Sequence, residues 1–119
     1  HAHVWTTGVD LADAARGDSR LFLHDLQAGT RLVHDFGTGQ VAGEFVHVPY
    51  GPGELEGWLL GLVTDGATSS LEILDAADFA GPPVARVLIP QRIPPGFHGN
   101  WIGAPALQAA AERAYCGKR

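Results

Sequence analysis

Cysteine, methionine and basic residues are scarce in this chain of 119 residues, and each shortage limits what the protein can be. The single cysteine, Cys116, excludes an internal disulfide, and nothing indicates an oxidising compartment, so we expect a cytoplasmic protein. No apolar run approaches 18 residues and no charged-then-apolar leader is visible, so we expect no membrane span and no signal peptide. Eight basic against 13 acidic residues give a net charge of −5, which argues against a nucleic-acid partner.

The missing methionine also bears on what kind of chain this is. The sequence opens on the run from His1 to Trp5, which is typical of the interior of a strand. We therefore expect a fragment or a trimmed chain. The length suits one small domain, and the 45% of hydrophobic residues can supply a modest core. Sixteen glycines and eight prolines favour turns over long helices.

Short apolar runs separated by turn residues predict strands. Residues 21–26 and 31–36 flank the sequence Gln-Ala-Gly-Thr, which predicts a β-hairpin with Gly29 at positive φ. In the next strand, residues 43–49, Phe45 and His47 should share one face and Glu44 the other. The continuously apolar run 58–63 predicts a strand covered on both faces.

Two more strands and one helix complete the expected elements. Residues 70–75 alternate after a turn at 65–69, and residues 84–90 form a further strand that ends in prolines. Residues 104–115 have high helix propensity, with Pro105 in the first turn. Strands about ten residues apart with hairpin turns predict an all-β antiparallel protein. It could be a sandwich, a barrel or a propeller, and no clean internal repeat distinguishes these architectures.

The histidine most open to a chemical role is His98, which lies in a loop after the last strand in the sequence Gly-Phe-His-Gly. Neutral imidazole is a good ligand for iron, and Gly96 and Gly99 allow the backbone to bend close to a crowded site. For such a tetrapeptide alone, a loop histidine bonded to nearby carbonyl groups is the commoner situation.

Six segments in order, with matching spacing, resemble the carotenoid cleavage oxygenases, a family that includes bacterial stilbene-cleaving enzymes. They are residues 23–30, 43–49, 57–58 after an acidic stretch, 71–76, 83–87 and 96–101. The resemblance implies a seven-bladed β-propeller with iron on its axis. Residues 1–103 would supply about its last two blades, and residues 104–119 a C-terminal helix and tail.

The resemblance also implies roles for individual residues. His98 would be the last of four histidine ligands to a non-haem Fe²⁺. Glu44 would accept a hydrogen bond from the other ring nitrogen of His98 and so orient its ring. Phe97 and Trp101 would line an apolar substrate tunnel, although aromatic residues beside a site are more often simple packing.

The implied activity is O₂-dependent cleavage of a conjugated double bond in a carotenoid, apocarotenoid or stilbene, giving two carbonyl products. The three other iron ligands are absent from these 119 residues, so the remaining blades would have to supply them. The acidic stretch is only partly kept, at Glu54 and Glu56. Two alternatives stay open: an inactive propeller remnant that acts as a binding module, and an unrelated all-β domain.

The other histidines favour structural roles. His24 and His34 form matching His-Asp pairs in the two hairpin strands, which predicts a cross-strand surface pattern, and His1 and His3 lie near a ragged terminus. None of the six histidines shows a recognised metal-binding spacing, and no nucleophile elbow, phosphate loop or dinucleotide fingerprint is present. Cys116 lacks a convincing basic partner, which disfavours nucleophilic catalysis.

Overall fold

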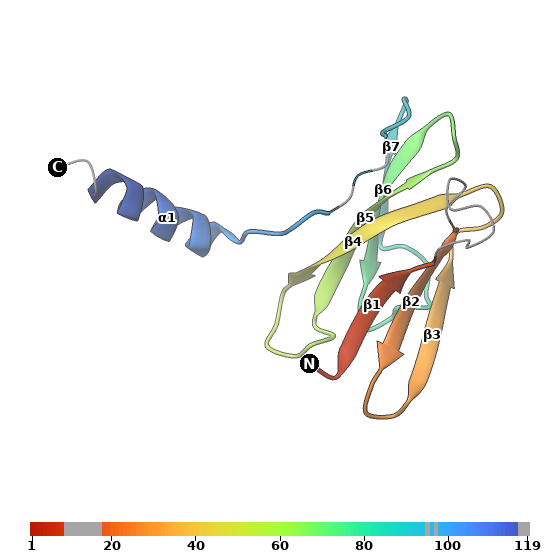
Figure 1. The fold of residues 1–119 in the computed structure, drawn as a ribbon, viewed down its shortest axis with the longest axis horizontal. Helices are drawn as coiled ribbons and strands as arrows, with labels where there is room; N and C mark the ends of the chain where they lie inside the picture. The colour runs from red at the N-terminus through yellow and green to blue at the C-terminus, as the bar shows by residue number, and fades with distance from the viewer. Residues whose placement is uncertain (9–17, 95, 97, 117–119) are drawn as a thin grey trace.

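The computed structural model describes residues 1–8, 18–94, 96 and 98–116, which form two antiparallel sheets and one helix (Figure 1). The first sheet has the order β1-β2-β3 and the second β4-β5-β6-β7. The strands are β1 (His3–Thr7), β2 (Arg20–Asp25), β3 (Thr30–Asp35), β4 (Val41–Pro49), β5 (Gly57–Thr64), β6 (Ser69–Asp75) and β7 (Ala85–Ile89), and the helix is α1 (Ala104–Cys116). The predicted antiparallel all-β architecture is confirmed, with three strands in the first sheet and four in the second among the described residues.

Local turn chemistry sets both hairpins that the sequence predicts. Gly29 has a φ of 67° in the β2–β3 turn, as expected, and Gly66 has a φ of 93° in the β5–β6 turn. The carboxylate of Asp25 accepts hydrogen bonds from two turn amides, and Asp65 does the same in its own turn. These N–H donors, that of Ala28 first, hold the pKa of Asp25 below its usual value.

The core lies between the two sheets. Its fully buried side chains come from β2, β5 and β6 and from the segment after β6: Leu21, Leu23, Leu59, Leu74, Ala76 and Phe79. Because successive side chains of a strand point to opposite faces, the buried residues of β2 and β5 alternate with more exposed ones. The closest contacts between the sheets join β1 and β2 to β4, so β4 lies at the junction of both layers.

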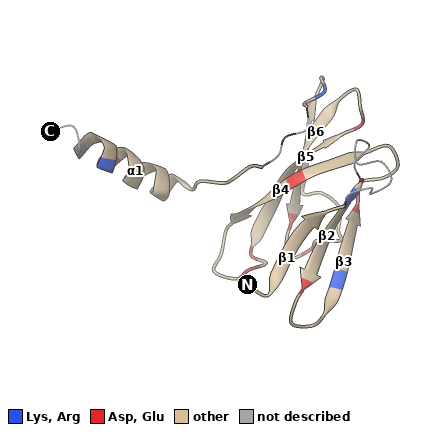
Figure 2. Cartoon of the chain, viewed as in Figure 1, with Lys and Arg blue, Asp and Glu red and all other residues tan. Residues whose placement is uncertain are grey.

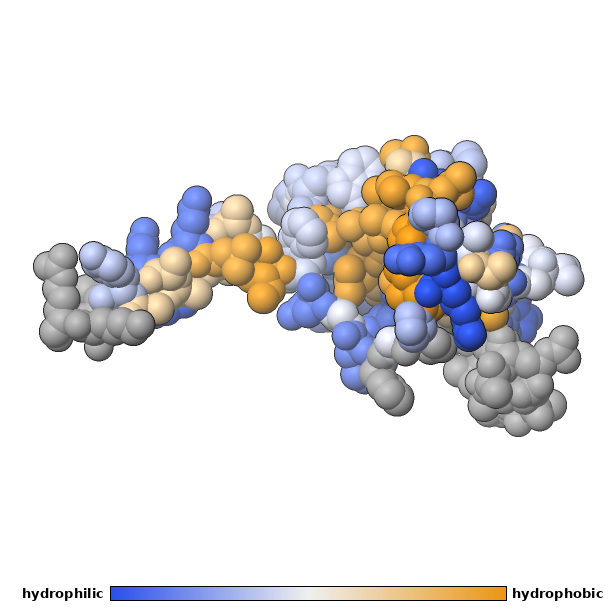
Figure 3. Space-filling view, turned by 90° about the horizontal axis from the view of Figure 1, so that it is seen from above, coloured by the Kyte–Doolittle hydropathy of each residue, from blue (hydrophilic) through white to orange (hydrophobic). Residues whose placement is uncertain are grey.

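The prediction that β5 is covered on both faces is wrong in this structure. Leu59, Gly61 and Val63 are buried toward the first sheet, whereas Leu62 on the opposite face is 37% exposed. A continuous apolar run does not reveal whether a second layer is present, and among the described residues none covers this face fully. Apolar side chains accordingly reach the surface of the sheet region in Figure 3.

His34 is not a surface residue, so the predicted cross-strand pattern of His24 and His34 is wrong. In the β2–β3 register His34 pairs with Leu21, and His24 pairs with Arg31, which places the two histidines on opposite faces. His34 is 8% exposed and its Nδ1 lies 3.0 Å from the carbonyl oxygen of Phe79. His24 instead lies 3.0 Å from the hydroxyl oxygen of Thr6.

A buried carboxylate on β6 was not anticipated. Glu72 is 1% exposed, and its Oε1 accepts hydrogen bonds from the Ser70 hydroxyl at 2.6 Å and from Arg86 Nε at 2.5 Å. Its Oε2 is buried without a partner among the described residues. Since a buried charge needs compensation, the Arg86 guanidinium is what makes this position tolerable for Glu72.

The helix α1 follows an extended segment and contacts no strand among the described residues (Figure 1). It is the helix predicted from residues 104–115, with Pro105 in its first turn. The Gly103 carbonyl accepts hydrogen bonds from the amides of Ala106 and Leu107. Within the described residues there is no helix with the length and apolar character needed to cross a membrane.

Candidate functional site

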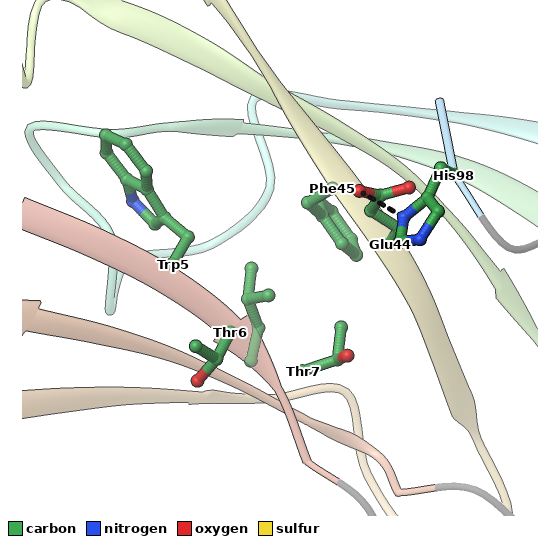
Figure 4. A pocket seen from close by; sticks show the side chains of 7 residues that line it. Trp5, Thr6, Thr7, Glu44, Phe45 and His98 are labelled. Atoms are coloured by element: carbon green, nitrogen blue, oxygen red, sulfur yellow. Dashed lines mark hydrogen bonds and ion pairs between the residues drawn. The ribbon is translucent and has the colours of Figure 1, made fainter. Parts of the chain in front are cut away.

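A pocket of about 310 Å³ opens between β1 and β4, the strands at which the two sheets meet (Figure 4). Its lining residues come from β1, β2, β4 and the segment after β7: Trp5, Thr6, Thr7, Leu21, Glu44, Phe45 and His98. Segments far apart in the chain therefore share one cavity. The pocket combines an apolar part with a small group of polar side chains, which is the usual composition of a ligand site.

A β-bulge in β4 directs Glu44 toward this pocket. The pairing of β4 with β5 shifts register between Ala42 and Phe45, so Gly43 and Glu44 lie at an irregular point of the ladder. Bulges of this kind re-aim side chains beside functional sites. Figure 2 shows an acidic segment on β4, and Glu44 is the only acidic residue of that strand.

The two faces predicted for β4 are confirmed. Phe45 packs over Gly61 and His47 over Gly57, both on the side of the core. Val46, one residue further along, approaches Gly99 on the other side. Glu44 reaches the same segment, because its carboxylate binds both His98 and Gly99.

Glu44 and His98, singled out separately in the sequence, lie together. The Nδ1 of His98 is 3.4 Å from Glu44 Oε1, which is a long hydrogen bond, and the Gly99 amide donates to Oε2 at 2.7 Å. Both carboxylate oxygens are thus engaged by one short segment. A carboxylate on one ring nitrogen fixes the tautomer and leaves Nε2 as the electron-pair donor.

The geometry of this pair limits what the chain can bind. The side chains of His98 and Glu44 are 88% and 41% exposed. Among the described residues, no cluster of three or more His, Cys, Asp or Glu side chains could hold a metal ion. The donor set therefore fits one metal-ligating histidine with its orienting carboxylate, and further ligands would have to come from elsewhere.

Gly96 and Gly99 lie on either side of His98 in the chain. None of the positive φ values among the described glycines belongs to Gly96 or Gly99, so neither uses the left-handed region. Gly99 contributes through its amide, which binds Glu44.

Of the two predicted tunnel residues, the structure describes only Trp101. Its side chain is 49% exposed and is not among the residues that line the pocket. Phe97 lies outside the described residues. Among the described residues, the aromatic side chains that line the pocket are Trp5 and Phe45, and Phe45 stacks on Phe36 with ring centroids 5.5 Å apart.

The N-terminal histidines are held in place, so the expectation of a ragged terminus is wrong. Glu54 accepts hydrogen bonds from His1 Nδ1 and His3 Nδ1, both at 2.9 Å, and from the Ala2 amide. These donors, His3 first, hold the pKa of Glu54 below its ordinary value of 4.5. Only the three-dimensional position of the loop that carries Glu54 could have revealed this contact.

The family model described as retinal pigment epithelial membrane protein matches residues 1–103. An apocarotenoid-15,15'-oxygenase of Synechocystis sp. is 41% identical over 65% of this chain and 16% of its own length. A carotenoid 9,10(9',10')-cleavage dioxygenase 1 of Pisum sativum is 37% identical over 92% of this chain and 23% of its own length.

Similarity to a solved structure agrees with these matches. Cobalt-substituted Synechocystis apocarotenoid oxygenase aligns with a TM-score of 0.75 at 31% identity, over 86% of this chain and 22% of that one. The chain thus spans about a fifth of the length of the proteins it matches. The family match over residues 1–103 excludes the reading as an unrelated all-β domain. This chain belongs to the carotenoid cleavage oxygenase family.

Proposed function

We propose that this chain is the C-terminal part of a non-haem Fe²⁺ dioxygenase that cleaves a conjugated carbon–carbon double bond. The substrate would be a carotenoid, an apocarotenoid or a stilbene, and addition of O₂ across the cleaved bond would give two carbonyl products. Residues 1–103 would form the last two blades of a seven-bladed propeller, and residues 104–119 a terminal helix and tail. We retain the cytoplasm as the expected compartment.

The observation that carries this proposal is the meeting of Glu44 and His98 at one pocket. They are 54 positions apart in the chain, yet the carboxylate binds both the His98 ring and the neighbouring Gly99 amide. A surface histidine with no ligand to bind would not require such an arrangement. The names of two relatives in this family describe them as an apocarotenoid oxygenase and a carotenoid cleavage dioxygenase. These names support the proposed substrate class.

His98 would hold the iron through Nε2, together with histidines from outside these 119 residues. Fe²⁺ so bound would supply a redox-active ion with open positions for O₂. Glu44 keeps the proton on Nδ1 of His98, so that Nε2 remains a donor, and the Gly99 amide holds Glu44 in place. Phe45 and Trp5 would present apolar surface to an alkene and exclude water from it.

The proposal is tested with the complete protein that contains this chain. After loading with Fe²⁺, it is incubated under O₂ with apocarotenals and with hydroxystilbenes, and the aldehyde products are identified by mass spectrometry. We expect two carbonyl fragments from at least one class, with one atom of ¹⁸O from ¹⁸O₂ in each fragment.

The alternative is a propeller remnant that binds ligands without turnover. The His98 side chain is 88% exposed, so in this chain it is open to solvent, and this exposure favours the binding-module alternative. Stoichiometric iron without aldehyde products from either substrate class would reject the oxygenase proposal in favour of this binding module.

A further inference from the structure

Thr6 and Thr7 are neighbours at the end of β1, but their side chains leave the strand on opposite faces. The hydroxyl oxygen of Thr6 lies 3.0 Å from His24 Nε2, on the face away from the second sheet. Thr7 is in register with Leu21, which is 1% exposed, so its side chain is on the face toward β4. Figure 4 shows Thr7 on the β1 side of the pocket, which Glu44 borders from β4 and His98 from the segment after β7.

The hydrogen bonds of the pocket leave few polar groups for a ligand. Both oxygens of Glu44 are engaged, by His98 Nδ1 and by the Gly99 amide. The Thr6 hydroxyl is engaged by His24. Within the part of the chain that the structure describes, three polar side-chain groups of this pocket remain without a partner: the Thr7 hydroxyl, His98 Nε2 and Trp5 Nε1. Because Trp5 Nε1 is buried, the Thr7 hydroxyl and His98 Nε2 are the two that we consider for a ligand.

The apolar surroundings of Thr7 make burial of its hydroxyl group unfavourable unless the group forms a hydrogen bond. Thr7 is half-buried, and Leu21 and Phe45, which line the pocket with it, are apolar. Valine would fill the same volume and favour a strand equally well, without removing a hydroxyl from water. A pocket of about 310 Å³ has room for a small ligand between Thr7 and His98.

We propose that Thr7 is a positioning residue whose hydroxyl donates a hydrogen bond to a small ligand held in front of His98 Nε2. The ligand class is a small molecule that can accept a hydrogen bond, which is O₂ in the proposed reaction and the azide anion as an experimental probe. This inference rests on the proposed function, because it requires a metal at His98. It adds a polar residue of the first sheet to the pair of Glu44, from β4, and His98, from the segment after β7.

The test measures azide binding to the complete protein loaded with Co²⁺, followed by the visible absorption of the metal. Three variants are compared with the wild type: Thr7→Val, Thr7→Ser and the control Thr30→Val, an exposed strand threonine of the same sheet that does not line the pocket. Loss of one hydrogen bond to a charged acceptor should weaken azide binding about tenfold or more in Thr7→Val. Thr7→Ser retains a hydroxyl and should bind azide within about twofold of the wild type, as should Thr30→Val. The cobalt content of all four proteins should stay the same.

Two contrary results separate this inference from the proposed function. If Thr7→Val binds cobalt and azide as tightly as the wild type, the role of Thr7 is refuted and the metal site stands. If Thr7→Ser loses azide binding as fully as Thr7→Val, the side chain acts through packing, and the inference is likewise refuted. If the wild type binds no more cobalt than His98→Ala, both the proposed function and this inference are refuted.

Discussion

Replacing Gly61 with alanine should destabilise the protein by about 1–3 kcal/mol, because the new methyl group would overlap the ring of Phe45. A Cβ built at Gly61 lies 2.4–2.5 Å from three ring carbons of Phe45. Ordinary contact begins near 3.4 Å, so the ring must move by about 1 Å. The backbone of Gly61 is not in the positive-φ region, so steric overlap is the source of the cost.

The ring of Phe45 has little freedom to move away. It stacks on Phe36, with centroids 5.5 Å apart and planes 18° apart, and such a stack contributes about 0.5–1.5 kcal/mol. Phe45 also lines the pocket and follows Glu44 in the chain. Gly61→Ala should therefore disturb the pocket wall as well as the core.

Urea unfolding of a double-mutant cycle measures this effect directly. In a Phe45→Ala background the alanine at position 61 should cost less than about 0.5 kcal/mol, since the overlapping ring is gone. Gly103→Ala is the matched control, because its Cβ would meet its nearest neighbour, in Pro105, at an ordinary 3.8 Å. An unchanged cost of Gly61→Ala in the Phe45→Ala background would refute this reasoning.

Two further predictions concern ionised side chains. Arg86→Met should destabilise the protein by about 1–3 kcal/mol in urea unfolding, because it leaves the carboxylate of Glu72 buried without its cation. Adding Glu72→Leu to this variant should recover most of the lost stability. If the double variant is no more stable than Arg86→Met, this explanation is contradicted. The lowered pKa of Glu54 means that its contacts with His3 and Ala2 stabilise the protein above about pH 4.5 and lose this effect as the pH falls through the folded-state pKa. Glu54→Gln should accordingly have a lower melting temperature than the wild type at neutral pH, and the two melting temperatures should converge in acid. A difference in melting temperature that does not change with pH would count against this prediction.

The features that the sequence could predict are those set by neighbouring residues. The turns at Gly29 and Gly66 follow from glycine at positive φ together with an aspartate that binds the turn amides. The helix from Ala104 follows from its run of alanines and from Pro105 in its first turn. Alternation along β4 placed Glu44 and Phe45 on opposite faces correctly, and a bulge precedes Phe45 in that strand.

Features that depend on contacts between distant segments could not be predicted in the same way. The burial of His34 depends on its register with Leu21 and on the carbonyl of Phe79. The burial of Glu72 depends on Arg86 in the neighbouring strand. Alternation alone fixes which residues share a face, but it does not determine which face is covered.

The candidate site shows the same division. His98 and Glu44 were singled out through resemblance to a family, and the structure brings their side chains together. Trp5 and Thr7 were not singled out, because β1 meets β4 only in the folded protein. Their pattern in the sequence is that of an ordinary strand.

The central claim is that His98 is a metal ligand oriented by Glu44, and the iron content of the purified complete protein tests it most directly. We expect stoichiometric iron in the wild type and in the control His24→Ala, because the His24 side chain is not among the residues that line the pocket. Glu44→Gln should weaken iron affinity about 10–100-fold, the usual effect of removing a carboxylate that orients a metal-bound histidine. His98→Ala should contain essentially no iron, whereas iron retained in His98→Ala at the wild-type level would contradict the account.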